Sequence, residues 1–138
     1  DILIAGCGTG QHSIIVASQF SDSQITAVDL SLTSLAYAKR KTTELGITNV
    51  KYLQADILRL EQMEKKFDII ESVGVLHHMN EPLAGWRTLT DLLKPGGLIK
   101  VGLYSEFDRK YIMETRKEIS LLNVGKSETE IKKFRQTR

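Results

Sequence analysis

Three glycines alternate with other residues in the segment Gly6-Cys7-Gly8-Thr9-Gly10, which follows an apolar run and precedes a helical pattern. Glycine permits positive φ angles and leaves no Cβ in the path of an approaching ligand. The first turn of the following helix offers unpaired N–H groups and a partial positive charge. The segment therefore predicts a binding site for a ligand that carries a carboxylate or a phosphate.

The spacing of the glycines narrows the choice of ligand. A dinucleotide-binding loop has the pattern G-x-G-x-x-G, which needs glycine at position 11, where this chain has Gln11. A P-loop ends in Gly-Lys-Ser or Gly-Lys-Thr, whereas this segment continues as Gly10-Gln11-His12. The loop is therefore not typical of a nicotinamide-dependent oxidoreductase or of a nucleoside triphosphatase.

Apolar runs alternate with amphipathic stretches, which indicates crossover units, a parallel sheet covered on both faces, and a doubly wound α/β fold. Ser31 is a candidate N-cap, and Gly46 is a candidate stop for the helix that it begins. A helix beginning at Pro82 is expected to bury Trp86 in the core. Residues 94–97 predict a turn, and residues 58–65 a weak helix or loop. The predicted strands cover residues 2–5, 24–29, 50–54, 67–75 and 98–104, and the predicted helices cover 11–20, 31–45, 82–93, 108–123 and 127–136.

Length and composition favour one ordinary globular domain over residues 1–138. The chain has 41% hydrophobic and 26% charged residues and a net charge of +2, too small to imply a nucleic-acid partner. A single cysteine excludes an internal disulfide and favours the cytoplasm. No apolar run approaches a membrane span and no signal-peptide pattern opens the chain. The chain begins without Met, inside a predicted core strand, so we expect a fragment of a longer protein.

Four motifs in order resemble the class I S-adenosylmethionine-dependent methyltransferases. They are the G-x-G-x-G loop, Asp29 ending the second strand, Asp56 after the third, and Lys-Pro-Gly-Gly before the fifth. The resemblance covers nearly the whole chain. It implies a five-stranded, mainly parallel sheet in the order 3-2-1-4-5 and S-adenosylmethionine as the cofactor. The family's terminal antiparallel hairpin is not recognisable after Tyr104, so the fifth strand is expected to keep an unpaired edge. We therefore expect the chain by itself to be marginally stable, self-associating or poorly active.

The resemblance also implies roles for single residues. Asp29 would accept hydrogen bonds from both ribose hydroxyls, and Asp56 would accept one from the adenine amino group. Each aspartate also fits a helix cap or a turn. Leu30 would pack on the adenine ring, and the N–H of Ile57 would face a ring nitrogen. The methionine end would lie over the first glycines. The expected cofactor-binding residues are Gly6, Cys7, Gly8, Gly10, Asp29, Leu30, Asp56, Ile57 and Val73.

One position departs from the family pattern. The family often carries Asp or Glu two residues before the first glycine, and this chain has Ile4 there. The group that holds the methionine ammonium is therefore expected elsewhere, for example at the carbonyl of Gly6 or at a carbonyl near Val73.

The segment Leu76-His77-His78 follows the fourth strand, where the reacting methyl group is expected. The amino-group methyltransferases of DNA carry Asn/Asp-Pro-Pro-aromatic here and this chain does not, so we expect no DNA partner. The Leu-His-His segment instead resembles the small-molecule methyltransferases of the family, which leaves the acceptor unidentified, and we expect no membrane partner. His77 is the candidate catalytic base, with pocket lining and a structural role as alternatives. His12 would approach the methionine carboxylate or lie on the helix surface. No ligand spacing predicts a metal site.

The resemblance thus predicts a methyltransferase that moves the methyl group from the sulfonium of S-adenosylmethionine to an unidentified acceptor by in-line displacement. The alternative is a cofactor-binding module without independent activity that needs the rest of a larger chain. The chain also resembles, less specifically, the methyltransferase segment found beside tetratricopeptide repeats, which agrees with both predictions. From residue 108 onward the chain has nine Lys and Arg against five Asp and Glu. That basic tail predicts either a solvated helix face or a surface for an acidic partner.

Overall fold

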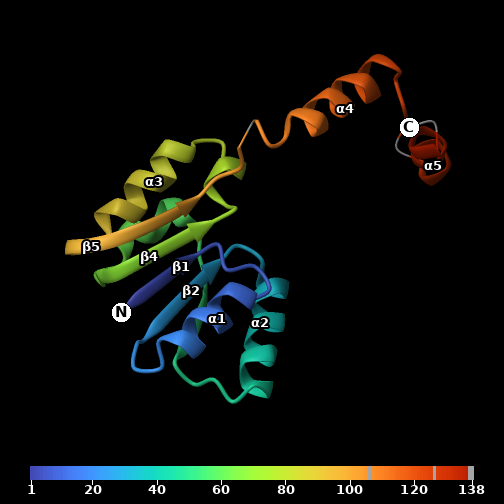
Figure 1. The fold of residues 1–138 in the computed structure, drawn as a ribbon. Helices are drawn as coiled ribbons and strands as arrows, with labels where there is room; N and C mark the ends of the chain where they lie inside the picture. The colour runs from blue at the N-terminus through green and yellow to red at the C-terminus, as the bar shows by residue number, and fades with distance from the viewer. Residues whose placement is uncertain (106, 126, 137–138) are drawn as a thin grey trace. The chain divides into compact units, whose positions relative to one another are not determined.

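The computed structural model describes residues 1–105, 107–125 and 127–136 (Figure 1). The chain divides into two compact units, Asp1–Leu103 and Tyr104–Arg138. The first unit holds the sheet and every predicted site residue.

The first unit is built on a five-stranded sheet whose paired strands all run parallel, in the order β3-β2-β1-β4-β5. This confirms the predicted fold class and strand order. Because β1 is central, β2 and β3 lie on one side of it, and β4 and β5 lie on the other (Figure 1). The strands are β1 (Ile2–Ala5), β2 (Ile25–Asp29), β3 (Val50–Gln54), β4 (Phe67–Val73) and β5 (Leu93–Gly102).

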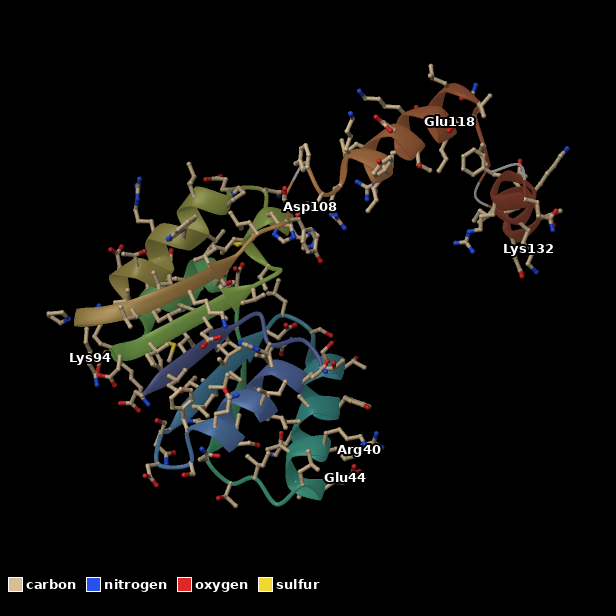
Figure 2. All side chains as sticks on the ribbon, viewed as in Figure 1. Arg40, Glu44, Lys94, Asp108, Glu118 and Lys132 are labelled. Atoms are coloured by element: carbon tan, nitrogen blue, oxygen red, sulfur yellow. The ribbon has the colours of Figure 1, made fainter. Side chains whose placement is uncertain are left out.

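Helices cover both faces of the sheet. Side chains alternate along β1, so Ile2 and Ile4 pack in a core with residues of α1 and α2, while Leu3 and Ala5 pack in a second core with residues of η1, η2 and α3. Exposed charges occupy the outer side of α2, including the pair Arg40–Glu44 (Figure 2). The helices of this unit are α1 (Gln11–Gln19), α2 (Leu32–Glu44) and α3 (Pro82–Asp91), with the short 3-10 helices η1 (Ile57–Gln62) and η2 (Leu76–His78).

The predicted helix signals are confirmed where α2 begins and ends. The hydroxyl oxygen of Ser31 accepts a hydrogen bond from the N–H of Ser34 at 3.2 Å, as an N-cap should. Gly46 follows the helix with φ of 69°, a left-handed conformation that favours glycine.

The fifth strand begins earlier than predicted. Leu93 already pairs with Phe67, and the register then jumps so that Leu98 pairs with Ile69. Residues 94–97 therefore bulge out of β5 instead of forming a turn before it. The fourth strand is shorter than predicted and ends at Val73.

The prediction for Trp86 was wrong. In α3, Leu89 is fully buried, but Trp86 is 38% exposed and Leu83 is 77% exposed. Gly85 is the reason that α3 presents this face: a Cβ on Gly85 would lie 2.7 Å from Sδ of Met79. The helix approaches its neighbours through Gly85 and Leu89, and Trp86 lies beside that contact.

The second unit contains α4 (Lys110–Leu121) and α5 (Glu128–Gln136). Neither helix buries a residue fully. Across the part of the chain that the structure describes, no helix combines the length and the apolar character needed to span a bilayer.

Candidate functional site

The glycine loop follows β1 in a conformation that its three glycines make possible. Gly6, Gly8 and Gly10 have φ angles of 82°, 52° and 86°. A Cβ on Gly6 would collide with the side chain of Val75, and one on Gly10 would lie 2.5 Å from Cβ of Ala38. A Cβ on Gly8 would meet nothing within 4 Å. Two of the glycines thus permit close packing, and Gly8 borders open space.

Asp29 connects this loop to the end of β2. Its Oδ2 accepts a hydrogen bond from the N–H of Gly8 at 2.8 Å, and its Oδ1 accepts one from the N–H of Ser31 at 2.9 Å. These two bonds fix the orientation of the carboxylate. Each oxygen keeps a second lone pair for a ligand.

A cavity of about 230 Å³ lies at the carboxyl ends of the strands, where open α/β sheets bind their ligands. Asp29 and Asp56 supply its carboxylates, and the other lining residues are glycine or apolar. Five residues of the predicted cofactor set are among those that line it. The lining residues are Gly6, Val28, Asp29, Leu30, Ala55, Asp56, Ile57, Val75 and Met79.

Asp56 both caps a helix and lines the cavity. Its Oδ1 accepts a hydrogen bond from the N–H of Leu58 at 3.0 Å, which begins η1. Ile57 is the first residue of that helix, so its N–H has no acceptor within the helix. Of the two alternatives for Asp56 on sequence grounds, the structure shows the helix cap, and the same residue lines the cavity.

Four residues of the predicted set do not line this cavity: Gly8, which borders open space, and Cys7, Val73 and Gly10. Cys7 is buried in the core beside α1, where desolvation first and the charge of Asp29 second raise the pKa of its thiol to about 11. Val73, at the end of β4, is 47% exposed. Gly10 packs against α2 instead.

His77 lies in η2, between Val75 and Met79, which do line the cavity. Both of its ring nitrogens are shielded from solvent, and its ring lies 4.1 Å from that of His78, centroid to centroid. Among the described residues, no three His, Cys, Asp or Glu side chains gather as a metal site would require.

One polar pair near the loop was not predicted. Nε2 of His12 in α1 lies 2.6 Å from Oε2 of Glu71 in β4. Nζ of Lys100 lies 3.3 Å from the same oxygen. Only 13% of the Glu71 side chain is exposed. The available signal was a carboxylate directly after the apolar pair Ile69-Ile70 of a strand, but its partner His12 lies 59 residues away in sequence.

Comparisons with known proteins agree with this geometry. A family model described as a methyltransferase domain matches residues 2–97. A protein of Synechococcus sp., named only as uncharacterized, is 35% identical over 122 residues, which is 88% of this chain and 29% of that protein. The (S)-coclaurine N-methyltransferase of Papaver somniferum is 35% identical over 100 residues, which is 72% of this chain and 28% of that enzyme.

A solved structure shares the fold as well. Coclaurine N-methyltransferase bound to N-methylheliamine and SAH superposes with a TM-score of 0.67 at 25% identity, covering 72% of this chain and 29% of that one. The chain thus spans less than a third of the length of these proteins.

Proposed function

The chain belongs to the class I S-adenosylmethionine-dependent methyltransferases, and we propose that its cavity binds S-adenosylmethionine for methyl transfer to a small-molecule acceptor. The observation that carries this proposal is the meeting of Gly6, Asp29 and Asp56 around one cavity, each from the end of a different neighbouring strand.

The lining of the cavity suits an adenosine group. Adenine is flat and largely apolar, and Leu30, Ala55 and Ile57 supply an apolar surface. Ribose carries two adjacent hydroxyl groups, and a carboxylate oriented like that of Asp29 can accept a hydrogen bond from each of them. The open space beside Gly8 leaves room for the amino-acid end of the cofactor. The residues present therefore fit this cofactor.

The proposed roles follow from these contacts. Asp29 binds the ribose hydroxyls with a carboxylate that Gly8 and Ser31 already orient, so little ordering is needed on binding. Asp56 accepts a hydrogen bond from the adenine amino group with Oδ2, the oxygen that takes no part in the cap of η1. Leu30, which is 67% exposed, covers the ring and loses that exposure.

S-adenosylmethionine supplies a methyl group activated by a positively charged sulfur. The protein's task is to hold the acceptor in line with that group and to exclude water, and such orientation lowers the barrier by several kcal/mol. Where the acceptor carries a proton, we assign its removal to His77, which follows Val75 at the edge of the cavity. Its shielded ring must turn toward the acceptor to do so.

Calorimetry with S-adenosylhomocysteine and with NAD tests the binding proposal. We expect the chain to bind the first and not the second, because Gln11 replaces the third glycine of a dinucleotide loop. A folded chain that binds NAD, or that fails to bind S-adenosylhomocysteine, would contradict the proposal.

Catalysis is tested separately with methyl-labelled S-adenosylmethionine and panels of candidate acceptors. The rival proposal is a binding module that acts only within a longer protein, and it is favoured by the small share of the relatives' length that this chain spans. Binding without transfer by the chain, together with transfer by a longer form, would support the rival. We further propose a cytoplasmic location, in keeping with a single buried cysteine.

A further inference from the structure

Glu71 is a charged residue in a place where charge is costly. It lies in β4, one of the two strands that flank the central strand, and only 13% of its side chain is exposed. Its register neighbour on β1 is Ile4, which is buried in the core beside α1. Removing a carboxylate from water is unfavourable unless partners compensate it, so this position calls for an explanation.

The partners of Glu71 occupy only one of its two oxygens. Nε2 of His12 and Nζ of Lys100 both contact Oε2, at 2.6 and 3.3 Å. Within residues 1–105, 107–125 and 127–136, Oε1 receives no hydrogen bond. The carboxylate is thus held firmly on one side and has an acceptor to spare on the other.

Glu71 does not line the cavity itself, but it lies on the strand beside the one that leads into the glycine loop. Asp29 and Asp56 follow β2 and β3, on one side of β1, and Glu71 lies on the other side. Ile4 pairs with Glu71, and the glycine loop starts two residues beyond Ile4, a rise of about 7 Å. A ligand whose nucleoside lies between the two aspartates reaches β4 only by passing the end of β1, where a Cβ on Gly8 would meet nothing within 4 Å.

We propose that Oε1 of Glu71 binds the α-ammonium group of the cofactor's amino-acid end. His12 is the positioning residue, because it holds Oε2 and leaves Oε1 as the acceptor of the same carboxylate that a ligand can use. This inference rests on the proposed function, since it concerns one end of the same ligand. It places the ammonium-binding carboxylate on β4, beside the strand position that Ile4 occupies.

A pair of ligands tests the inference without altering the protein. S-adenosylhomocysteine carries the ammonium group, and its desamino analogue keeps the carboxylate, the sulfur and the adenosine but lacks that group. We expect calorimetry to show that the chain binds S-adenosylhomocysteine about tenfold more tightly, the contribution of one charge-assisted hydrogen bond.

Variants then assign this preference to the residue. In Glu71→Gln the preference should fall to about twofold or less, through weaker binding of S-adenosylhomocysteine with little change for the analogue. In His12→Ala it should fall part of the way, because Lys100 still holds Oε2. Asp68→Asn is the matched control: it removes a carboxylate from the same strand, and the preference should stay at its original value.

The outcomes separate the two proposals. If the unaltered chain binds neither ligand, the proposed function fails and this inference fails with it. If it binds both equally, or if folded Glu71→Gln keeps the full preference, only the inference about Glu71 is overturned. Because the first comparison uses the unaltered chain, the inference stays testable even if a variant does not fold.

Discussion

The N–H of Gly8 donates a hydrogen bond to Oδ2 of Asp29 at 2.8 Å, which ties the glycine loop after β1 to the end of β2. The contact orders the loop and the carboxylate at once. Substitutions at either residue are therefore expected to act on ligand binding through both.

Asp29→Ala should weaken binding of S-adenosylhomocysteine by about 1–3 kcal/mol, because charge-assisted hydrogen bonds to the ribose and to Gly8 are lost together. Isothermal titration calorimetry measures the change. Asp22→Ala is the control, since Asp22 is an exposed carboxylate in the turn before β2. Equal affinities of Asp29→Ala and the unaltered chain would remove the ribose assignment.

Gly8→Val should abolish cofactor binding while the chain still folds. A valine Cβ at Gly8 meets no protein atom within 4 Å, so it occupies the space that the ligand needs, and the positive φ costs about 1–2 kcal/mol. Gly46→Val is matched to it, because Gly46 also has positive φ and open surroundings but lies at the end of α2. Thermal unfolding should show similar losses for both variants, and calorimetry should show lost binding for Gly8→Val alone. Retained binding in folded Gly8→Val would refute the prediction.

The thiol of Cys7 should react slowly in the folded chain. Burial raises its pKa from 9.0 to about 11, so the reactive thiolate is about a hundredfold scarcer at pH 8 than in an unperturbed thiol. Reaction with a chromogenic disulfide at pH 8 should be slow in buffer and fast in urea, and the folded rate should rise with pH toward 11. A folded rate equal to the rate in urea would show that Cys7 is accessible.

Leu89→Ala should destabilise the first unit by about 2–5 kcal/mol, because it opens a cavity in the core beneath α3. Leu83→Ala, one and a half turns earlier on the same helix, should stay within about 0.5 kcal/mol of the unaltered chain, since Leu83 is 77% exposed. Urea unfolding followed by Trp86 fluorescence measures both. Equal losses would mean that α3 presents a different face to the sheet.

The sequence was most informative where a local pattern sufficed. The glycine loop, Asp29 and Asp56 stand at or just after strand ends, and a parallel fold brings strand ends to one edge, so their meeting at one cavity was predictable. The strand order was an implication of the family resemblance. Ser31 was predictable as a cap because capping depends on neighbours within one turn.

Features that depend on packing between distant parts of the sequence could not be predicted. Trp86 has the spacing of a core residue, but Gly85 lets Met79 approach the helix and leaves Trp86 at the margin. The pairing of Leu93 with Phe67 starts β5 before the Pro-Gly-Gly segment, which local turn chemistry alone would place outside a strand. The bond between His12 and Glu71 depends on which strands become neighbours, and no local pattern carries that information.

The central position of β1 also bears on how the chain folds. β1 pairs with β2 soon after it in sequence, whereas its other partner, β4, follows only after β2, α2, β3 and η1. Loop closure costs about 0.6 kcal/mol for each doubling of length, so the entropic difference between the two pairings is small. During synthesis β2 follows β1 out of the ribosome before β4 does, so the pairing that brings Glu71 beside Ile4 becomes available last. The strand ends that carry Asp29 and Asp56 can thus take shape during translation before β4 brings Glu71 beside Ile4.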